Sequence, residues 1–131
     1  MDKRRIMVVD DSRVVYAEMN KMLQDTEFEI AAYCRSGEEA LERYEEVRPE
    51  LITLDIVMPG MDGLATCGEM RKRWPESRIF MVSSMAYEDT INQAAELGAK
   101  GFLFKPFTRE SLLEGLRGAV KAIDKEGKSH G

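Results

Sequence analysis

Short apolar runs alternate with longer segments of helical spacing along this chain. The runs predict strands at about 5–9, 28–33, 50–54, 78–82 and 101–104. Between them, apolar residues that recur every three or four positions predict helices at about 13–25, 37–47, 63–73, 87–98 and 109–123. The last helix has the clearest apolar stripe, formed by Leu112, Leu116, Ala119, Val120 and Ile123. Strict alternation of strand and helix predicts an α/β fold, a parallel sheet with helices on both faces.

Capping residues agree with several of these boundaries. Ser36 and Glu39 have the spacing of a capping box, and Thr108 is placed to cap the last helix. Gly98 follows the fourth helix at a position that favours glycine. We assign residues 1–123 to one domain and 124–131 to a polar tail, which we expect to be disordered.

Composition narrows the class of protein. The 131 residues are 44% hydrophobic and 33% charged with a net charge of −5, which does not favour binding to nucleic acid. Cys34 and Cys67 form no CxxC pair, so we expect free buried thiols and a reducing compartment. The only histidine, His130, lies in the tail, which excludes histidine triads and HExxH zinc sites. No segment has the ~18 apolar residues of a membrane span, and the first apolar run is too short for a signal peptide, so we expect a cytoplasmic protein without membrane insertion.

Polar side chains follow the predicted strands where these strands end. Asp10 and Asp11 close the first strand, Asp55 the third, Ser83 the fourth and Lys105 the fifth. The carboxyl ends of parallel strands share one edge of the sheet, so these residues should converge there. Adjacent carboxylates at a buried strand end need a compensating cation, and no basic residue follows the pair directly. We therefore expect the cation to come from outside, as Mg²⁺ held by the three carboxylates.

These five side chains suit phosphoryl transfer to a carboxylate. Asp55 would be the nucleophile, since aspartyl phosphates are a known class of covalent intermediate. Ser83 would donate a hydrogen bond to a phosphoryl oxygen, and Lys105 would supply positive charge. Because this chemistry depends on positioning and charge stabilisation, it needs no histidine as a general base.

Four segments together resemble the receiver domain of two-component response regulators, and more narrowly the CheY-type single-domain regulators of chemotaxis. They are Asp10-Asp11, Asp55-Ile56-Val57-Met58-Pro59-Gly60-Met61-Asp62-Gly63, Ser83-Ser84 and Gly101-Phe102-Leu103-Phe104-Lys105-Pro106-Phe107. The resemblance covers the chain from about Arg4 to Ile123. It implies a flavodoxin-like (βα)5 three-layer sandwich whose parallel five-stranded sheet has the order 2-1-3-4-5, which the strand-helix alternation also favours.

The resemblance also implies roles for individual residues. Asp55 matches the phosphoacceptor, and Asp10, Asp11, Asp55 and the backbone carbonyl of Val57 match the Mg²⁺ ligands. The chain would be a switch that promotes only its own phosphorylation and dephosphorylation.

Three further positions match the switch machinery of the family. Ser83 stands at the Ser/Thr switch position, Lys105 at the lysine position before an expected cis bond to Pro106, and Phe102 at the position of the switch aromatic. The implied partners are a sensor histidine kinase as phosphodonor and an output protein on the face of helix four, strand five and helix five. The resemblance implies a monomer or weak dimer that does not contact nucleic acid directly.

Other interpretations stay open at this point. The chain could be a receiver domain excised from a longer regulator with a transcriptional or enzymatic output domain. A Mg²⁺-dependent phosphatase with an aspartyl nucleophile needs a second acid two residues on, where this chain has Val57. A flavin mononucleotide carrier would place its phosphate beside Asp10 and Asp11, which would repel it. Val57 and Met85 are apolar where several family members have polar residues, and we expect slower hydrolysis of the phosphoryl group as a result.

Overall fold

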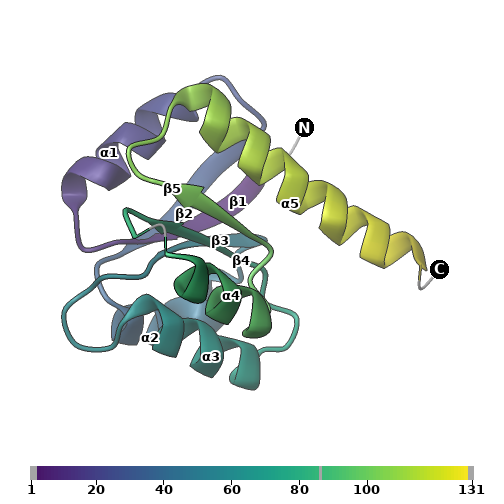
Figure 1. Cartoon of the computed structure of the whole chain (residues 1–131). Helices are drawn as coiled ribbons and strands as arrows, with labels where there is room; N and C mark the ends of the chain where they lie inside the picture. Colours follow the sequence, from purple (N-terminus) through teal and green to yellow (C-terminus); the bar gives the residue numbers. More distant parts are fainter. Residues whose placement is uncertain (1–2, 86, 130–131) are drawn as a thin grey trace.

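Strands and helices alternate from the first strand to the last helix in the computed structural model (Figure 1). The structure describes residues 3–85 and 87–129, and within the last helix it leaves out the side chains of 122–129. The strands are β1 (Arg4–Val9), β2 (Phe28–Cys34), β3 (Leu51–Asp55), β4 (Ile79–Ser83) and β5 (Gly101–Phe104). The helices are α1 (Arg13–Met22), α2 (Gly37–Val47), α3 (Gly63–Arg73), α4 (Glu88–Glu96) and α5 (Arg109–Ser129).

The strands form one parallel sheet in the order β2-β1-β3-β4-β5, as predicted. Helices α1 and α5 cover one face, and α2, α3 and α4 cover the other (Figure 1). Each face buries its own apolar cluster. One contains Met19 of α1 with Leu112 and Leu116 of α5, and the other contains Tyr44 of α2 and Met70 of α3. Since β1, β3 and β4 are buried on both faces, their sequences are almost continuously apolar.

Side-chain caps fix where the helices begin, and hence where the loops at the carboxyl edge of the sheet lie. The Ser36 Oγ atom accepts from the Glu39 backbone N–H at 3.0 Å, and the Ser111 backbone N–H donates to the Thr108 Oγ1 atom at 3.0 Å. Both caps were predicted. Gly98 follows α4 with φ of 97°, the left-handed conformation that glycine adopts at low cost.

Two helix ends differ from the prediction. Helix α1 ends at Met22 rather than near residue 25, because the chain turns there and Asp25 takes a positive φ of 60°. Helix α5 continues to Ser129, past the predicted helix end near residue 123, and the assignment of residues 124–131 to a tail stays a prediction. That segment has no proline and is rich in residues compatible with a helix, so polarity alone did not mark an end. The side chain of Ile123 and all of His130 lie outside the described part of the chain.

The cysteine prediction is confirmed, since Cys34 and Cys67 are buried free thiols. Burial raises the pKa of each thiol to about 11, which makes both poor nucleophiles. In the described part of the chain, no helix has the length and apolar character needed to span a bilayer.

Candidate functional site

Asp10 is held rigidly at the carboxyl end of β1. Its backbone N–H donates to the Cys34 carbonyl at 3.0 Å, which continues the pairing with β2. Its Oδ1 atom accepts from the backbone N–H of Ser12 at 2.9 Å, and Ser12 in turn caps α1 through Val15. The Asp10 side chain is therefore buried and fixed in direction, whereas its neighbour Asp11 is exposed.

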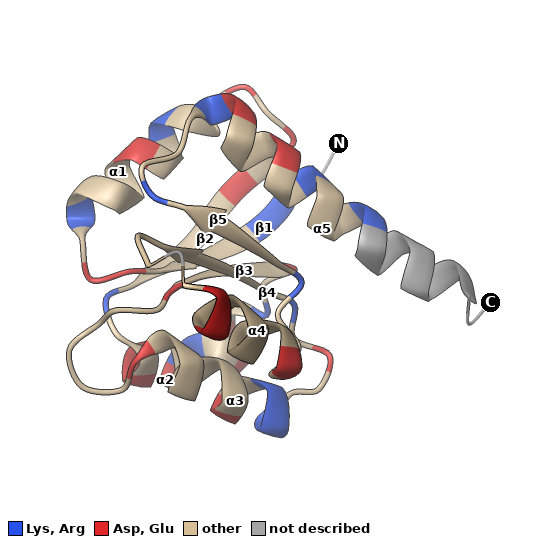
Figure 2. Ribbon diagram, in the orientation of Figure 1, with Lys and Arg blue, Asp and Glu red and all other residues tan. Residues whose placement is uncertain are grey.

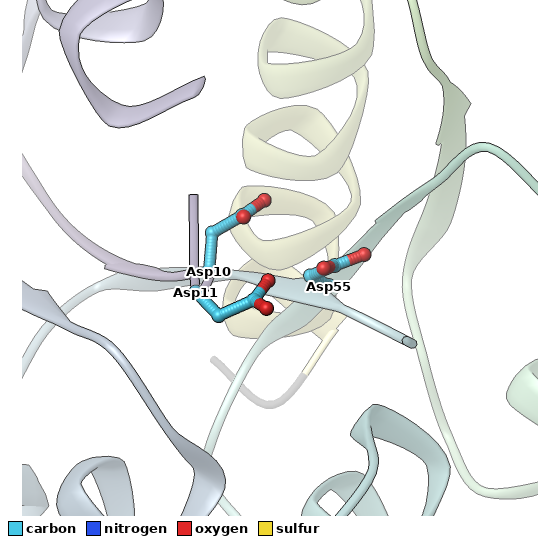
Figure 3. A group of neighbouring side chains, drawn as sticks. All are labelled: Asp10, Asp11 and Asp55. Carbon is cyan, nitrogen blue, oxygen red and sulfur yellow. The ribbon is translucent and has the colours of Figure 1, made fainter. Parts of the chain in front are cut away.

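The three predicted carboxylates meet at one place. Asp55, the last residue of β3, is buried and lies beside the end of β1. Figure 3 shows the side chains of Asp10, Asp11 and Asp55 gathered in one region. One oxygen from each carboxylate lies within 4.8 Å of the other two. The prediction that residues 45 positions apart in the chain share one site is confirmed.

Lys105, directly after β5, reaches the same site. Its Nζ atom lies 2.8 Å from the Asp10 Oδ2 atom and 3.4 Å from the Asp55 Oδ1 atom. The predicted convergence of Lys105 with the acidic pair and Asp55 is therefore confirmed. The lysine partly compensates the carboxylates, although no basic residue follows Asp10 and Asp11 directly in the chain. One ammonium against three carboxylates still leaves a formal excess of two negative charges.

The electrostatics of the site reflect this excess. Burial, and then the charge of Asp10, raises the pKa of Asp55 from 3.8 to about 6, although Lys105 acts in the opposite direction. For Lys105, burial alone would lower the pKa. Its hydrogen bond to Asp10 and the charges of both carboxylates outweigh that effect and raise the pKa. The lysine is thus held in its charged form, while the ionised form of Asp55 is destabilised.

This donor set fits a hard divalent cation. Carboxylate oxygens at close range, without cysteine or histidine, are the ligands that Mg²⁺ prefers. The uncompensated negative charge equals the charge of one such ion. Val57, whose carbonyl was predicted as a further ligand, follows Asp55 by two positions, and the residue is 54% exposed. The ligand role of that carbonyl stays a prediction.

The loop from β3 to α3 explains part of the Asp55–Gly63 motif. Asp62 caps α3, with its Oδ1 atom accepting from the Ala65 backbone N–H at 2.8 Å. The Gly63 backbone N–H donates to the Ile56 carbonyl at 2.8 Å. A Cβ atom on Gly63 would lie only 2.1 Å from the Asp55 carbonyl oxygen, so only glycine fits. Gly63 therefore lets the end of the loop pack directly against the backbone of Asp55, the residue with which the motif begins.

Ser83 lies at the end of β4, next to the strand that ends in Asp55. It is fully buried, and its Oγ atom accepts from the Met85 backbone N–H at 3.1 Å. Because the oxygen acts as an acceptor there, the hydroxyl proton stays available for donation. Met85 itself is half-buried in the loop after β4.

Phe102 lies in the edge strand β5, half-buried between the sheet and α4. Its ring contacts Phe104 at 5.2 Å between centroids, with the two planes tilted by 51°. It also lines a cavity of about 270 Å³ that includes Ile91 and Ala95 of α4. The Lys105-Pro106 peptide bond is cis, as predicted.

Two features of this region were missed by the sequence interpretation. Ser12 both caps α1 and fixes the Asp10 carboxylate, and its position before a predicted helix was a usable signal. Phe104 is 46% exposed, which the apolar pattern of a short strand does not indicate.

Comparisons with known proteins agree with this geometry. The family model for the response regulator receiver domain matches residues 6–117. The chemotaxis protein CheY of Listeria monocytogenes is 35% identical over 117 residues, which cover 89% of this chain and 98% of that protein. CheY of Bacillus subtilis is 36% identical over 86% of this chain and 93% of its own length. Among solved structures, the CheX-CheY-BeF3-Mg complex of Borrelia burgdorferi contains a similar chain, with a TM-score of 0.82, 28% identity and coverage of 86% of this chain and 85% of that one.

Proposed function

The chain belongs to the response regulator receiver domain family, and on that premise we propose that Asp55 accepts a phosphoryl group from a phosphohistidine of a sensor histidine kinase. The protein is a response regulator of two-component signal transduction, and its CheY relatives place it among regulators of the chemotaxis type. One observation carries the assignment of Asp55. It is the buried carboxylate that lies within reach of both the acidic pair and Lys105.

The proposed transfer conserves atoms and charge. An oxygen of the Asp55 carboxylate attacks phosphorus, a P–O bond forms, and the P–N bond to the donor imidazole breaks. The electron pair of that bond leaves with the imidazole nitrogen. Lys105, with its Nζ atom 3.4 Å from the Asp55 carboxylate, is placed to offset charge on a phosphoryl oxygen. Asp10 keeps the lysine at that position through its 2.8 Å contact.

Asp10, Asp11, Asp55 and the Val57 carbonyl would hold Mg²⁺. The bound ion would screen the negative charge of the acceptor and of the incoming phosphoryl group, which would otherwise repel each other. Its affinity would derive from the two negative charges that Lys105 leaves uncompensated. The acidic pair would therefore hold the metal, and Asp55 would accept the phosphoryl group.

Ser83 and Phe102 would convert phosphorylation into a change of surface. The free hydroxyl proton of Ser83 would be donated to a phosphoryl oxygen, drawing the residue toward Asp55. Ser83 pairs in register with Phe104 of β5, so its movement acts directly on the strand that carries Phe102. The 270 Å³ cavity beside Phe102 gives that ring room to change rotamer. Phosphorylation can shift such an equilibrium only through its different interaction with the two states.

We expect the output protein to bind the face formed by α4, β5 and α5. The movement of Ser83 and the rotamer change of Phe102 would alter this face. The Borrelia burgdorferi relative was solved together with a second protein, CheX, which supports output by protein-protein contact. We expect both the kinase and the output partner to meet this protein in the cytoplasm. The protein would act as a phosphoacceptor switch rather than as a turnover enzyme, and Val57 at the position where an aspartyl phosphatase needs its second acid supports this interpretation.

The decisive experiment is incubation with acetyl phosphate and Mg²⁺, followed by intact mass spectrometry. The unmodified chain should gain one phosphoryl group, and Asp55→Asn should gain none. Asp62→Asn is the matched control, because it removes another carboxylate of the same motif and asparagine keeps the cap of α3. An adduct on Asp55→Asn, or none on the unmodified chain, would contradict the proposal.

A further inference from the structure

A cavity of about 670 Å³ lies at the opposite edge of the sheet from Asp55, between the start of β1, the start of β2 and α5. Its apolar walls include Phe28, which belongs to the core, and Val120, which packs against the same core. The volume falls within the range of ~300–1,000 Å³ typical of small-ligand pockets. The proposed phosphorylation mechanism makes no use of this cavity.

The rim of the cavity is positively charged. Lys3, Arg4, Arg117 and Lys121 line it together with only two acids, Glu27 and Glu50. In Figure 2 blue turns of α5 lie beside the blue start of β1, near the label of the N-terminus. A local excess of two positive charges is notable in a chain whose net charge is −5.

Both acids of the rim are already paired. Arg117 binds Glu27 through two hydrogen bonds, from Nε at 2.8 Å and Nη2 at 2.9 Å, and the hydrogen bonds lower the pKa of Glu27 to about 2. Arg4 binds Glu50 at 3.0 Å. The excess charge therefore belongs to Lys3 and Lys121, which are both exposed. Long lysine side chains of this kind can bend over an apolar surface to meet an anion.

We propose that this cavity binds a small amphipathic anion, a molecule with an apolar body and one carboxylate that is free in solution. The apolar body would lie against Val120, because Phe28 behind it is only 1% exposed, and the carboxylate would lie between Lys3 and Lys121. The paired acids would not repel it, because their charge is satisfied by Arg117 and Arg4. A neutral ligand would lose the ionic contacts, and a cationic ligand would meet two lysines.

The site is tied to α5, which also forms part of the proposed output face. Arg117, Val120 and Lys121 line the cavity, while Leu112 and Leu116 of the same helix are buried against the sheet. A bound ligand would contact a helix that the output protein is expected to meet. Binding itself does not depend on Asp55, and the two proposals can fail separately.

The test uses the full chain and decanoate as probe, with decanol and decylamine as neutral and cationic analogues. Amide resonances in ¹⁵N–¹H correlation spectra would locate the site and give the dissociation constants. Decanoate should shift the resonances of residues 3, 28, 120 and 121 together, and decanol should bind about tenfold more weakly, as expected for loss of hydrogen bonds to charged groups. Equal affinity for the two, or shifts centred elsewhere, would overturn the proposal.

Charge reversal provides the matched control. The double variant Lys3→Glu/Lys121→Glu should weaken decanoate at least about tenfold, again from lost charge-assisted contacts. Lys72→Glu, at an exposed position of α3 that does not line the cavity, should leave affinity within twofold of the unmodified chain, as usual for screened surface charges. If both variants weakened decanoate binding equally, the effect would reflect the overall charge of the protein and would contradict the proposed site. Binding to vesicles of anionic phospholipid with no response to decanoate would also overturn it, since the ligand would then be a membrane surface.

Discussion

Ionisation of Asp55 is energetically unfavourable in the unphosphorylated folded protein. Asp55 is a buried carboxylate close to two others, so its ionised form is less stable in the folded chain than in the unfolded one. Lys105 offsets only part of this cost. The same arrangement prepares the residue for its proposed role, because a cation and a phosphoryl group would relieve the repulsion. Instability at this residue is therefore linked to reactivity.

A pH-dependent stability difference should follow from that cost. The folded-state pKa of Asp55 is about 6, against an ordinary value of 3.8. The folded state thus holds this proton more tightly than the unfolded state does, and the associated stability is present below about pH 4 and lost as the pH rises through 6. In chelator, Asp55→Asn should be more stable than the unmodified chain above pH 6 by about 2–3 kcal/mol, as two pKa units imply.

The measurement is urea unfolding of both chains from pH 4 to 8, with the difference between them plotted against pH. Other titrating groups cancel in that difference. A gap that stays constant with pH would contradict the raised pKa. Added Mg²⁺ should stabilise the unmodified chain more than the variant, because the variant lacks one of the proposed ligands.

Two apolar side chains beside the site should set the lifetime of the phosphoryl group. Val57 is largely exposed two residues after Asp55, and Met85 lies two residues after Ser83. Neither can hold a water molecule in line for attack. Replacement by Val57→Asn and Met85→Glu should therefore accelerate dephosphorylation several-fold, by supplying polar groups that orient water. Loss of the phosphorylated mass with time would be compared with Val14→Asn, an exposed valine of α1 that should leave the rate unchanged. Equal rates in all chains would defeat the hypothesis.

At the scale of elements, two glycines should respond oppositely to the same substitution. Gly63 opens α3 against the backbone of Asp55, and an added Cβ would lie 2.1 Å from the Asp55 carbonyl oxygen. Gly63→Ala should destabilise the fold by about 1–3 kcal/mol, the usual cost of overpacking, and should slow phosphorylation. Gly118, in the exposed middle of α5, has no atom within 4 Å of an added Cβ. Gly118→Ala should instead stabilise by about 0.5–1 kcal/mol through helix propensity. Urea unfolding decides both, and a stabilising Gly63→Ala would refute the close contact.

The elements themselves were largely predictable because each has a local signal. Apolar runs marked β1, β3 and β4, and Ser36 and Thr108 marked the starts of α2 and α5. The failures occurred where no local signal exists. Helix α5 continues past Ile123 although the apolar stripe stops there, because polar residues such as lysine and glutamate are also helix formers.

At the scale of the whole molecule, the sequence predicts which residues form the site but not which of them contact each other. The rule that parallel strands present their carboxyl ends at one edge brought Asp10, Asp55 and Lys105 together from three strand ends. It did not reveal that Lys105 lies closer to Asp10 than to Asp55, which depends on side-chain packing. The cavity between α5 and the sheet could likewise not be predicted, since its lining comes from four distant segments.

The proposed switch should change amide hydrogen exchange only near the β4–β5 edge of the sheet. Ser83 is the last residue of β4, and β4 pairs only with β3 and β5 among the described strands. Beryllofluoride with Mg²⁺, as a mimic of the phosphoryl group, should therefore change amide hydrogen exchange in α4, β5 and the start of α5. Strand β2, which pairs only with β1 among the described strands, should keep its exchange rates. The same reagents on Asp55→Asn should change nothing.

Phe102→Ala separates propagation from binding in that experiment. This variant keeps every proposed ligand of the mimic, so protection near Asp55 should persist. It lacks the ring that is placed to move in the cavity beside α4, so the response of α4 should shrink. Exchange that changes equally over the whole chain would mean global stabilisation rather than a switch. Changes limited to the loops around Asp55 would mean that the signal does not reach the α4, β5 and α5 face.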